Sequence, residues 1–273
     1  MHNHEPGGIA PELFRGISRW LKASRAIGCS RASSASRVFQ AAGFGNIAEQ
    51  AEGVHVAGFG NTARQAEGIQ ASGFLNIARN IEGVQAAGFI NVASKVQGLQ
   101  IGFINLADTV VGLPVGFLSI ARDGYRKLEF SAGDAMNLNL GFKIGVRHFY
   151  NIFTTGFQFT SDDPIFSYGY GLGTEINLPE RRYLNIEILT HQLMKGRWWD
   201  YEDLNLLGQL RVTYAMDLND RWQFFAGPVA NIHITRANAN ETVDLAPYEM
   251  FRFTGRNTEN VAWLGIKAGF RFW

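Results

Sequence analysis

Gly43-Phe44-Gly45-Asn46 is the first of six copies of a G-F-x-N motif that follow one another along the first half of the chain. Later copies begin at Gly58, Gly73, Gly88, Gly102 and Gly116, and the last one ends in serine instead of asparagine. Successive copies are 15, 15, 15, 14 and 14 residues apart. A fixed period this short indicates a small structural unit that is stacked on copies of itself.

Alignment of the copies separates apolar columns from polar ones. The apolar columns are Val54, Ile69, Val84, Leu99, Leu113; Val56, Ala71, Ala86, Ile101, Val115; Ile47, Thr62, Ile77, Val92, Leu106, Ile120; and Ala51, Ala66, Ile81, Val96, Val110. The polar columns are His55, Gln70, Gln85, Gln100, and Glu49, Arg64, Arg79, Ser94, Asp108. We therefore expect the apolar columns to point into each unit, the polar columns to point outward, and the fixed glycines to turn the chain.

Two architectures fit this pattern, a β-solenoid with one coil per copy and a meander with one strand per copy. The shorter copies lack one residue between Ile101 and Gly102, and a deletion inside a single strand would exchange its two faces. Deletion of a residue at a glycine that turns the chain between two strands would leave the faces of both strands unchanged. Stacked amides also form a hydrogen-bonded ladder only where like positions are neighbours. The sequence thus favours the solenoid, with an asparagine ladder of Asn46, Asn61, Asn76, Asn91 and Asn105.

One copy resembles the repeat of a known family. Gln85, Gly88, Asn91, Ala93 and Gln97 resemble the Q-x-G-x-x-N-x-A-x-x-x-Q repeat of curli subunits, and the array is similar to surface-repeat proteins of outer-membrane-bearing bacteria. It departs from curli in an extra residue before the glycine and in a shorter coil. Acidic residues also replace the last glutamine in three copies: Glu52, Glu67 and Glu82. The resemblance implies stacked coils and not fibre formation, because that acidic column repels its own copies.

The chain before the array is harder to interpret. Residues 1–37 match the repeats poorly, and a degenerate first coil, a capping helix near residues 11–25 and a disordered basic lead all stay open. No apolar run typical of a signal peptide is present in residues 1–40. The single cysteine, Cys29, excludes an internal disulfide. A net charge of +1 argues against nucleic acid as a partner.

After Tyr125 the period changes to two, which indicates β-strands. Met136, Leu138 and Leu140 begin an apolar row, while Asn137 and Asn139 begin the polar one. Eight strands are expected, at 128–132, 136–146, 149–159, 166–178, 183–194, 204–216, 222–234 and 262–273. The longer ones reach the length of about 9–11 residues that a bilayer requires. We therefore divide the chain into a lead (1–37), a repeat array (38–124) and a β-barrel (125–273) of about eight strands, or about fourteen if the repeats join it.

The connections support a membrane barrel. Short turns alternate with longer loops, as in outer-membrane barrels. Most tryptophans of this half lie near strand ends, as in an interfacial belt. The final Phe270-Arg271-Phe272-Trp273 resembles the assembly signal of outer-membrane proteins, although its apolar row is offset by one residue. These features imply a lipid bilayer as partner and the bacterial outer membrane as location. The alternative is a soluble barrel or sandwich with the apolar rows inside.

The polar rows carry the candidate site residues. They contain most of the glycines, which leave room in a narrow barrel for a lumen charge network of Lys143, Arg147, Glu175, Glu187, Arg211, Lys267 and Arg271. A predicted outer loop carries the best binding candidates for sugar or lipid headgroups, Arg197, Trp198, Trp199 and Tyr201, although anchoring in the interfacial belt fits them too. The loop 235–261 is a candidate lid, added strand or contact surface.

Nothing in the sequence indicates catalysis. His148, His191 and His233 lack metal-ligand spacing, and Ser161-Asp162-Asp163 lacks a nucleophile-elbow context. We therefore expect no catalytic residue, cofactor or metal. The first interpretation is a non-enzymatic surface or envelope scaffold with an envelope protein or glycan as partner. A channel is the second, and a membrane-embedded enzyme using His191 or Asp162 is the third. With eight strands, the array would lie on the periplasmic side.

Overall fold

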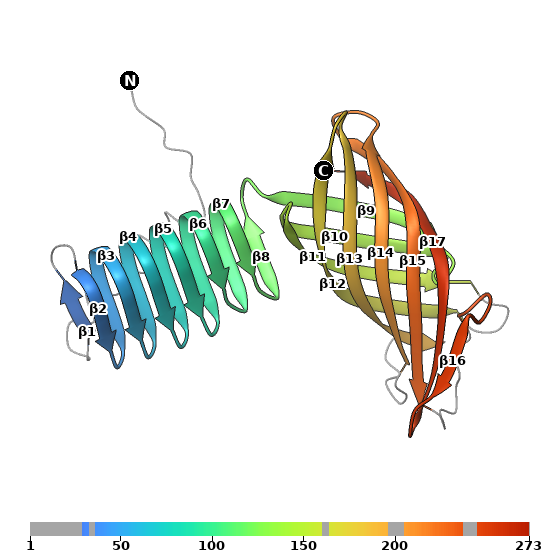
Figure 1. The fold of residues 1–273 in the computed structure, drawn as a ribbon, viewed down its shortest axis with the longest axis horizontal. Coiled ribbons are helices and arrows are strands. Elements are labelled where there is room, and N and C mark those ends of the chain that lie inside the picture. Colours follow the sequence, from blue (N-terminus) through green and yellow to red (C-terminus); the bar gives the residue numbers. More distant parts are fainter. Residues whose placement is uncertain (1–28, 33–35, 160–163, 196–204, 237–244, 273) are drawn as a thin grey trace. The chain divides into compact units, whose positions relative to one another are not determined.

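The computed structural model describes residues 29–32, 36–159, 164–195, 205–236 and 245–272 (Figure 1). The chain divides into two compact units, one of residues 1–125 with 144–146 and one of 126–143 with 147–273. Throughout the described ranges the regular elements are strands, as the sequence predicted. These ranges contain no helix long and apolar enough to cross a membrane.

The repeats form a stack of coils in one parallel sheet. Its strands are β1 (Cys29–Ala32), β2 (Ser36–Ala42), β3 (Gly45–Ala57), β4 (Gly60–Ser72), β5 (Leu75–Ala87), β6 (Ile90–Ile101), β7 (Ile104–Val115) and β8 (Leu118–Ala121). Like positions are direct neighbours, for example Asn61 beside Asn76. The predicted solenoid is therefore confirmed. The fourteen-stranded alternative is not formed, because these strands pair only within their own sheet.

The array begins earlier than the motif indicates. Both β1 and β2 pair in parallel with β3, with Cys29 beside Gly45 and Ser36 beside Ala51. The described residues of the lead therefore form a degenerate first coil, which is one of the three interpretations that the sequence left open. The predicted capping helix near residues 11–25 lies outside the described residues.

The interior of the coils differs from the predicted one. The core consists mainly of small side chains, namely Ala48, Ala51, Ala63, Ala66, Ala78, Ile81, Ala93, Val96 and Ala107. The column of His55, Gln70, Gln85 and Gln100 is buried, whereas Ile69 and Ile101 of the flanking apolar columns are 42% and 44% exposed. The predicted directions of these three columns were wrong. The coil admits amides that hydrogen-bond to their own copies, and the two columns that flank them point outward. The other two apolar columns are buried as predicted, for example Ile77 and Ile81, each 1% exposed.

The second half closes into a barrel of eight antiparallel strands, as predicted. These are β9 (Tyr125–Gly133), β10 (Leu138–Val146), β11 (Phe149–Gln158), β12 (Ile165–Leu178), β13 (Arg182–Lys195), β14 (Asn205–Asp217), β15 (Trp222–Arg236) and β17 (Thr258–Phe272). Pairing of β15 with β17 closes the sheet. A short strand, β16 (Phe251–Thr254), pairs with the first part of β17, beyond the reach of β9. The loop 235–261 thus contains an added strand.

Side chains in the barrel wall alternate between the two faces, so the polar rows face the lumen and the apolar rows face outward. Ile188 and Ile266 are 63% and 65% exposed on the outer wall, whereas Lys143 and Arg271 are fully buried inside. The alternative with the apolar rows inside is therefore wrong for this barrel. Short turns, residues 147–148 and 218–221 among them, lie at the end where β9 begins and β17 finishes.

Candidate functional site

The centre of the lumen is organised around the carboxylate of Glu129 on β9. Its oxygens accept from Lys143 Nζ at 2.7 Å and from Arg271 Nε at 2.8 Å, and Lys267 Nζ lies 3.4 Å away. All four side chains are buried. Three strands, β9, β10 and β17, thus bring one acid and three cations together. Such a group is stable out of water only as a set, because each buried charge depends on its partners.

A second buried acid, Glu187 on β13, completes this layer. It pairs with Lys143, accepts a hydrogen bond from the Tyr150 hydroxyl at 2.8 Å, and lies 3.6 Å from Arg271 Nη2. A glycine makes this arrangement possible. Gly173 stands beside Glu187 in the sheet, and a Cβ atom at Gly173 would lie 2.5 Å from the ring of Tyr150. The glycines of the polar row therefore provide room for lumen side chains.

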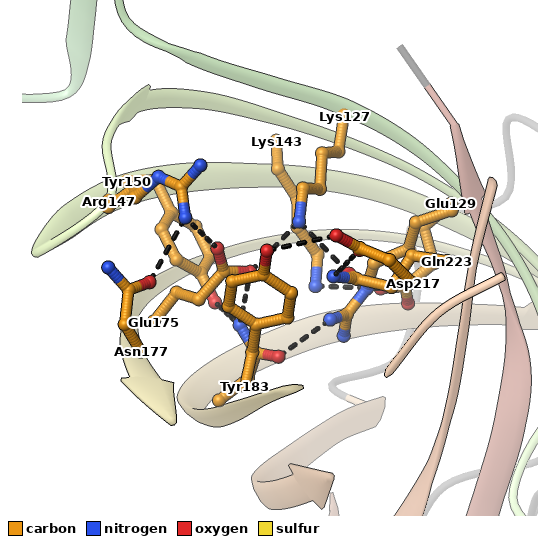
Figure 2. A network of polar contacts seen from close by, with 12 residues as sticks. Lys127, Glu129, Lys143, Arg147, Tyr150, Glu175, Asn177, Tyr183, Asp217 and Gln223 are labelled. Atoms are coloured by element: carbon orange, nitrogen blue, oxygen red, sulfur yellow. Dashed lines mark hydrogen bonds and ion pairs between the residues drawn. The ribbon is translucent and has the colours of Figure 1, made fainter. Parts of the chain in front are cut away.

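A further polar layer lies toward the short-turn end (Figure 2). Lys127 Nζ binds Glu175 at 2.9 Å and Gln223 Oε1 at 2.9 Å. Arg147 lies 3.6 Å from Glu175, and its side chain is half exposed. The Tyr183 hydroxyl donates to Asp217 at 2.9 Å in the same view.

Toward the long-loop end the lumen becomes apolar. Arg211 donates to Gln209 at 3.1 Å and lies 3.2 Å from His191 Nε2. Beyond this pair the indole of Trp263 donates to Asp134 at 2.6 Å. An apolar cluster surrounds that indole, formed by Ala135, Met136, Ile165, Leu193, Leu207, Leu245 and Trp263. Described side chains therefore occupy the lumen in layers from one end to the other.

All seven residues of the predicted lumen charge network face the lumen. Arg211 contacts His191 and Gln209, and the other six take part in the ion pairs described above. Sequence reasoning missed Lys127, Glu129 and Asp134. Tyr125, Lys127, Glu129 and Ser131 alternate with outward-facing residues, and this alternation could have identified Lys127 and Glu129 as lumen residues. For Lys127, the predicted strand would have had to begin before residue 128.

The asparagine column of the array forms a continuous ladder. Asn61 Nδ2 donates to Asn76 Oδ1 at 2.9 Å, and Asn76 Nδ2 donates to Asn91 Oδ1 at 3.1 Å. The same amide nitrogen of Asn76 also reaches the carbonyl of Ala86 at 2.7 Å. Equivalent bonds join Asn46 to Asn61 and Asn91 to Asn105. Each asparagine thus links its coil to the next and also bridges its own coil.

The metal-ligating residue types are dispersed in the part of the chain that the structure describes. No group of three metal-ligating side chains occurs in that part. His191 lies fully buried beside Arg211, and burial leaves it inaccessible to a substrate. The predicted loop residues Arg197, Trp198, Trp199 and Tyr201 and the Ser161-Asp162-Asp163 segment lie outside the described residues.

The outer wall of the barrel also carries an apolar groove of about 550 Å³. Its apolar lining includes Phe130, Leu138, Leu140, Phe157, Phe166 and Phe270. The groove follows β9 to β12 and β17 on the side that faces away from the lumen. Its chemistry suits a hydrocarbon and offers little to a polar ligand.

Comparison of the chain with protein-family models, with curated proteins and with solved structures found no match.

Proposed function

We propose that this chain is a non-enzymatic outer-membrane protein in which the barrel anchors the repeat array at the membrane surface. The array then serves as a scaffold for interaction with an envelope protein or glycan. The observation that carries the proposal is the inside-out barrel, with an apolar outer wall around a buried network of charges.

The apolar wall supports a bilayer as the surroundings of the barrel. Contiguous exposed apolar patches on soluble monomers rarely exceed a few hundred Å². Here most outward-facing side chains on the barrel strands are apolar and many are exposed, for example Leu138, Ile188, Leu210 and Ile266. Closed β-barrels satisfy all backbone hydrogen bonds within the wall, as a membrane requires.

A channel is less well supported. The interior of an eight-stranded barrel is just wide enough for side chains to fill it. In this lumen the Glu129 network and the apolar cluster around Trp263 occupy successive layers. We therefore expect planar bilayers that contain the folded protein to show no steady conductance, and a stable open pore would favour the channel instead.

The test of the membrane anchor uses lysine substitutions on the wall. Ile188→Lys and Ile266→Lys should each destabilise a bilayer-embedded barrel by about 2–4 kcal/mol, since a lysine in the hydrocarbon region costs about that much. Leu218→Lys is the matched control, because Leu218 is an exposed aliphatic residue in a turn. Urea titration of the full chain folded into phospholipid vesicles measures the three changes.

Two outcomes would contradict the proposal. One is equal tolerance of lysine at Ile188 and Leu218. The other is a native chain that stays soluble and monomeric without detergent and shows no difference in gel mobility between boiled and unboiled samples. Either result would mean that the wall does not face lipid.

A further inference from the structure

The charges of the array are confined to one part of each coil. Its Asp, Glu, Lys and Arg residues between Gly45 and Ala121 are Glu49, Glu52, Arg64, Glu67, Arg79, Glu82, Lys95 and Asp108. All of them precede the positive-φ glycines Gly53, Gly68, Gly83, Gly98 and Gly112 by no more than four residues. We call this part the charged edge. The rest of each coil, for example residues 84–93, contains no acidic or basic residue apart from His55 in the first coil.

The opposite part of the coil, half a period away, carries a continuous row of aromatic rings. Phe44, Phe59, Phe74, Phe89, Phe103 and Phe117 stack face to face, with ring centroids 5.0–5.7 Å apart. The last four are 37–48% exposed. We call this row the phenylalanine edge. Partly exposed aliphatic residues flank it on both legs of the coil, among them Leu75, Ile90, Ile101 and Ile104.

We propose that the phenylalanine edge is a membrane-contact surface that lies against the lipid of the bilayer in which the barrel is anchored. The inference rests on the proposed function, since it needs a bilayer around the barrel. A surface with aromatic and aliphatic side chains on one side and charges on the other matches the chemistry of the membrane interface. The occupant is therefore a lipid surface rather than a globular partner.

The connection between the two units supports lipid as the occupant. Only three residues separate β8, which ends at Ala121, from β9, which begins at Tyr125. An extended residue spans at most about 3.6 Å, so a bilayer around the barrel is within reach of the array without any spacer. Six coils of partly exposed apolar edge beside a bilayer gain free energy by removing that edge from water.

Site-specific fluorescence tests this contact in the full chain. The only cysteine is replaced by Cys29→Ser, and single cysteines are introduced as Phe89→Cys, Arg79→Cys and Ile188→Cys. Each is labelled with an environment-sensitive nitrobenzoxadiazole dye, and the protein is folded into phospholipid vesicles with and without nitroxide-labelled lipid. Phe89 reports on the phenylalanine edge, Arg79 on the charged edge of the same coil, and Ile188 on the barrel wall.

We expect the label at Phe89 to emit at shorter wavelength and to be quenched by nitroxide lipid several-fold more than the label at Arg79. Quenching at Ile188 together with equal, weak quenching at Phe89 and Arg79 would overturn the inference and leave the membrane anchor intact. A shift to shorter wavelength at Phe89 without lipid quenching would also overturn it, because a protein would then cover the edge. Absence of quenching at Ile188 would overturn the membrane anchor and the inference with it.

Discussion

Glu129 is the counter-ion of several buried cations in the barrel lumen. Its carboxylate contacts Lys143, Lys267 and Arg271, all of them buried. Glu129→Gln keeps the volume but leaves three cations short of a counter-charge, and breaking a buried pair in this way typically costs about 3–5 kcal/mol. We expect a loss of that size in urea unfolding of the folded barrel.

The matched control for this change is an exposed acid. Asp220→Asn removes one of the two acidic partners of Arg181 in a turn, where the Asp220 side chain is 93% exposed. Exposed pairs contribute about 0–1 kcal/mol, so this variant should unfold almost like the native chain. Similar losses for both variants would show that water reaches the lumen charges.

His55 is the irregular member of the buried amide column. Gln85 Nε2 donates to Gln70 Oε1 at 3.2 Å and Gln100 Nε2 donates to Gln85 Oε1 at 2.9 Å, whereas His55 Nε2 is buried and has no hydrogen-bond partner among the described residues. Burial lowers the pKa of His55, and a hydrogen bond with Glu52 opposes the change in part. The folded array therefore favours the neutral ring.

The sign of the resulting pH dependence follows from that lowered pKa. The stability that His55 contributes is present above the unfolded pKa of about 6.5 and is lost as the pH falls from there toward the folded pKa. His55→Gln should extend the ladder and remove this loss. The difference in unfolding free energy between variant and native chain should then grow from pH 7.5 to pH 5. A constant difference would mean that the imidazole is solvated.

The asparagine ladder acts at the level of the coil. Asn76→Ala removes the acceptor for Asn61 and the donor to Asn91, and it leaves buried polar atoms unpaired, at a cost of about 1–3 kcal/mol. Asn80→Ala, in the same coil but at the charged edge, is the control and should change stability little. Thermal unfolding of both variants, followed by circular dichroism, compares the two losses, and equal losses would contradict the structural role of the ladder.

A whole coil is the unit of the array. Deletion of residues 75–89 joins Phe74 to Ile90, restores a G-F-I-N motif and keeps every pairing in register. We expect the shortened chain to fold, because each coil contacts only its neighbours. Deletion of residues 75–82 joins Phe74 to Gly83 instead and should prevent the array from forming. Sedimentation and circular dichroism distinguish the two outcomes.

The positions of the strands were easier to predict from the sequence than the directions in which the side chains of the array point. Period two gave the barrel strands to within a few residues, and the largest differences are at β9, which begins at Tyr125 instead of 128, and at β17, which begins at Thr258 instead of 262. It also identified the lumen row, because glycine and charge share that row. The interior of the coils was predicted only in part. Ile77 and Ile81 are buried as expected, whereas the glutamine column lies inside and its two flanking apolar columns lie outside, because stacked amides hydrogen-bond within the coil. There Ala63, Ala78 and Ala93 form the core, while Ile69 remains outside.

For the whole molecule, the proposed outer-membrane anchor and the topology of the barrel together predict on which side of the membrane the array lies. The chain enters at β9 and leaves at β17 at one end of the barrel, and the short turns lie at that end. In outer-membrane barrels the short turns are periplasmic and the long loops extracellular. The array precedes β9 directly, so we expect it in the periplasm.

Labelling of intact cells tests this topology. In a Cys29→Ser background, Arg79→Cys should react with a membrane-impermeant maleimide only after the outer membrane is permeabilised. Met250→Cys, an exposed position in the connection that follows β15 at the long-loop end, should react in intact cells. Reaction at Arg79 in intact cells would place the array outside the cell, where its phenylalanine edge would meet the outer leaflet instead of the inner one.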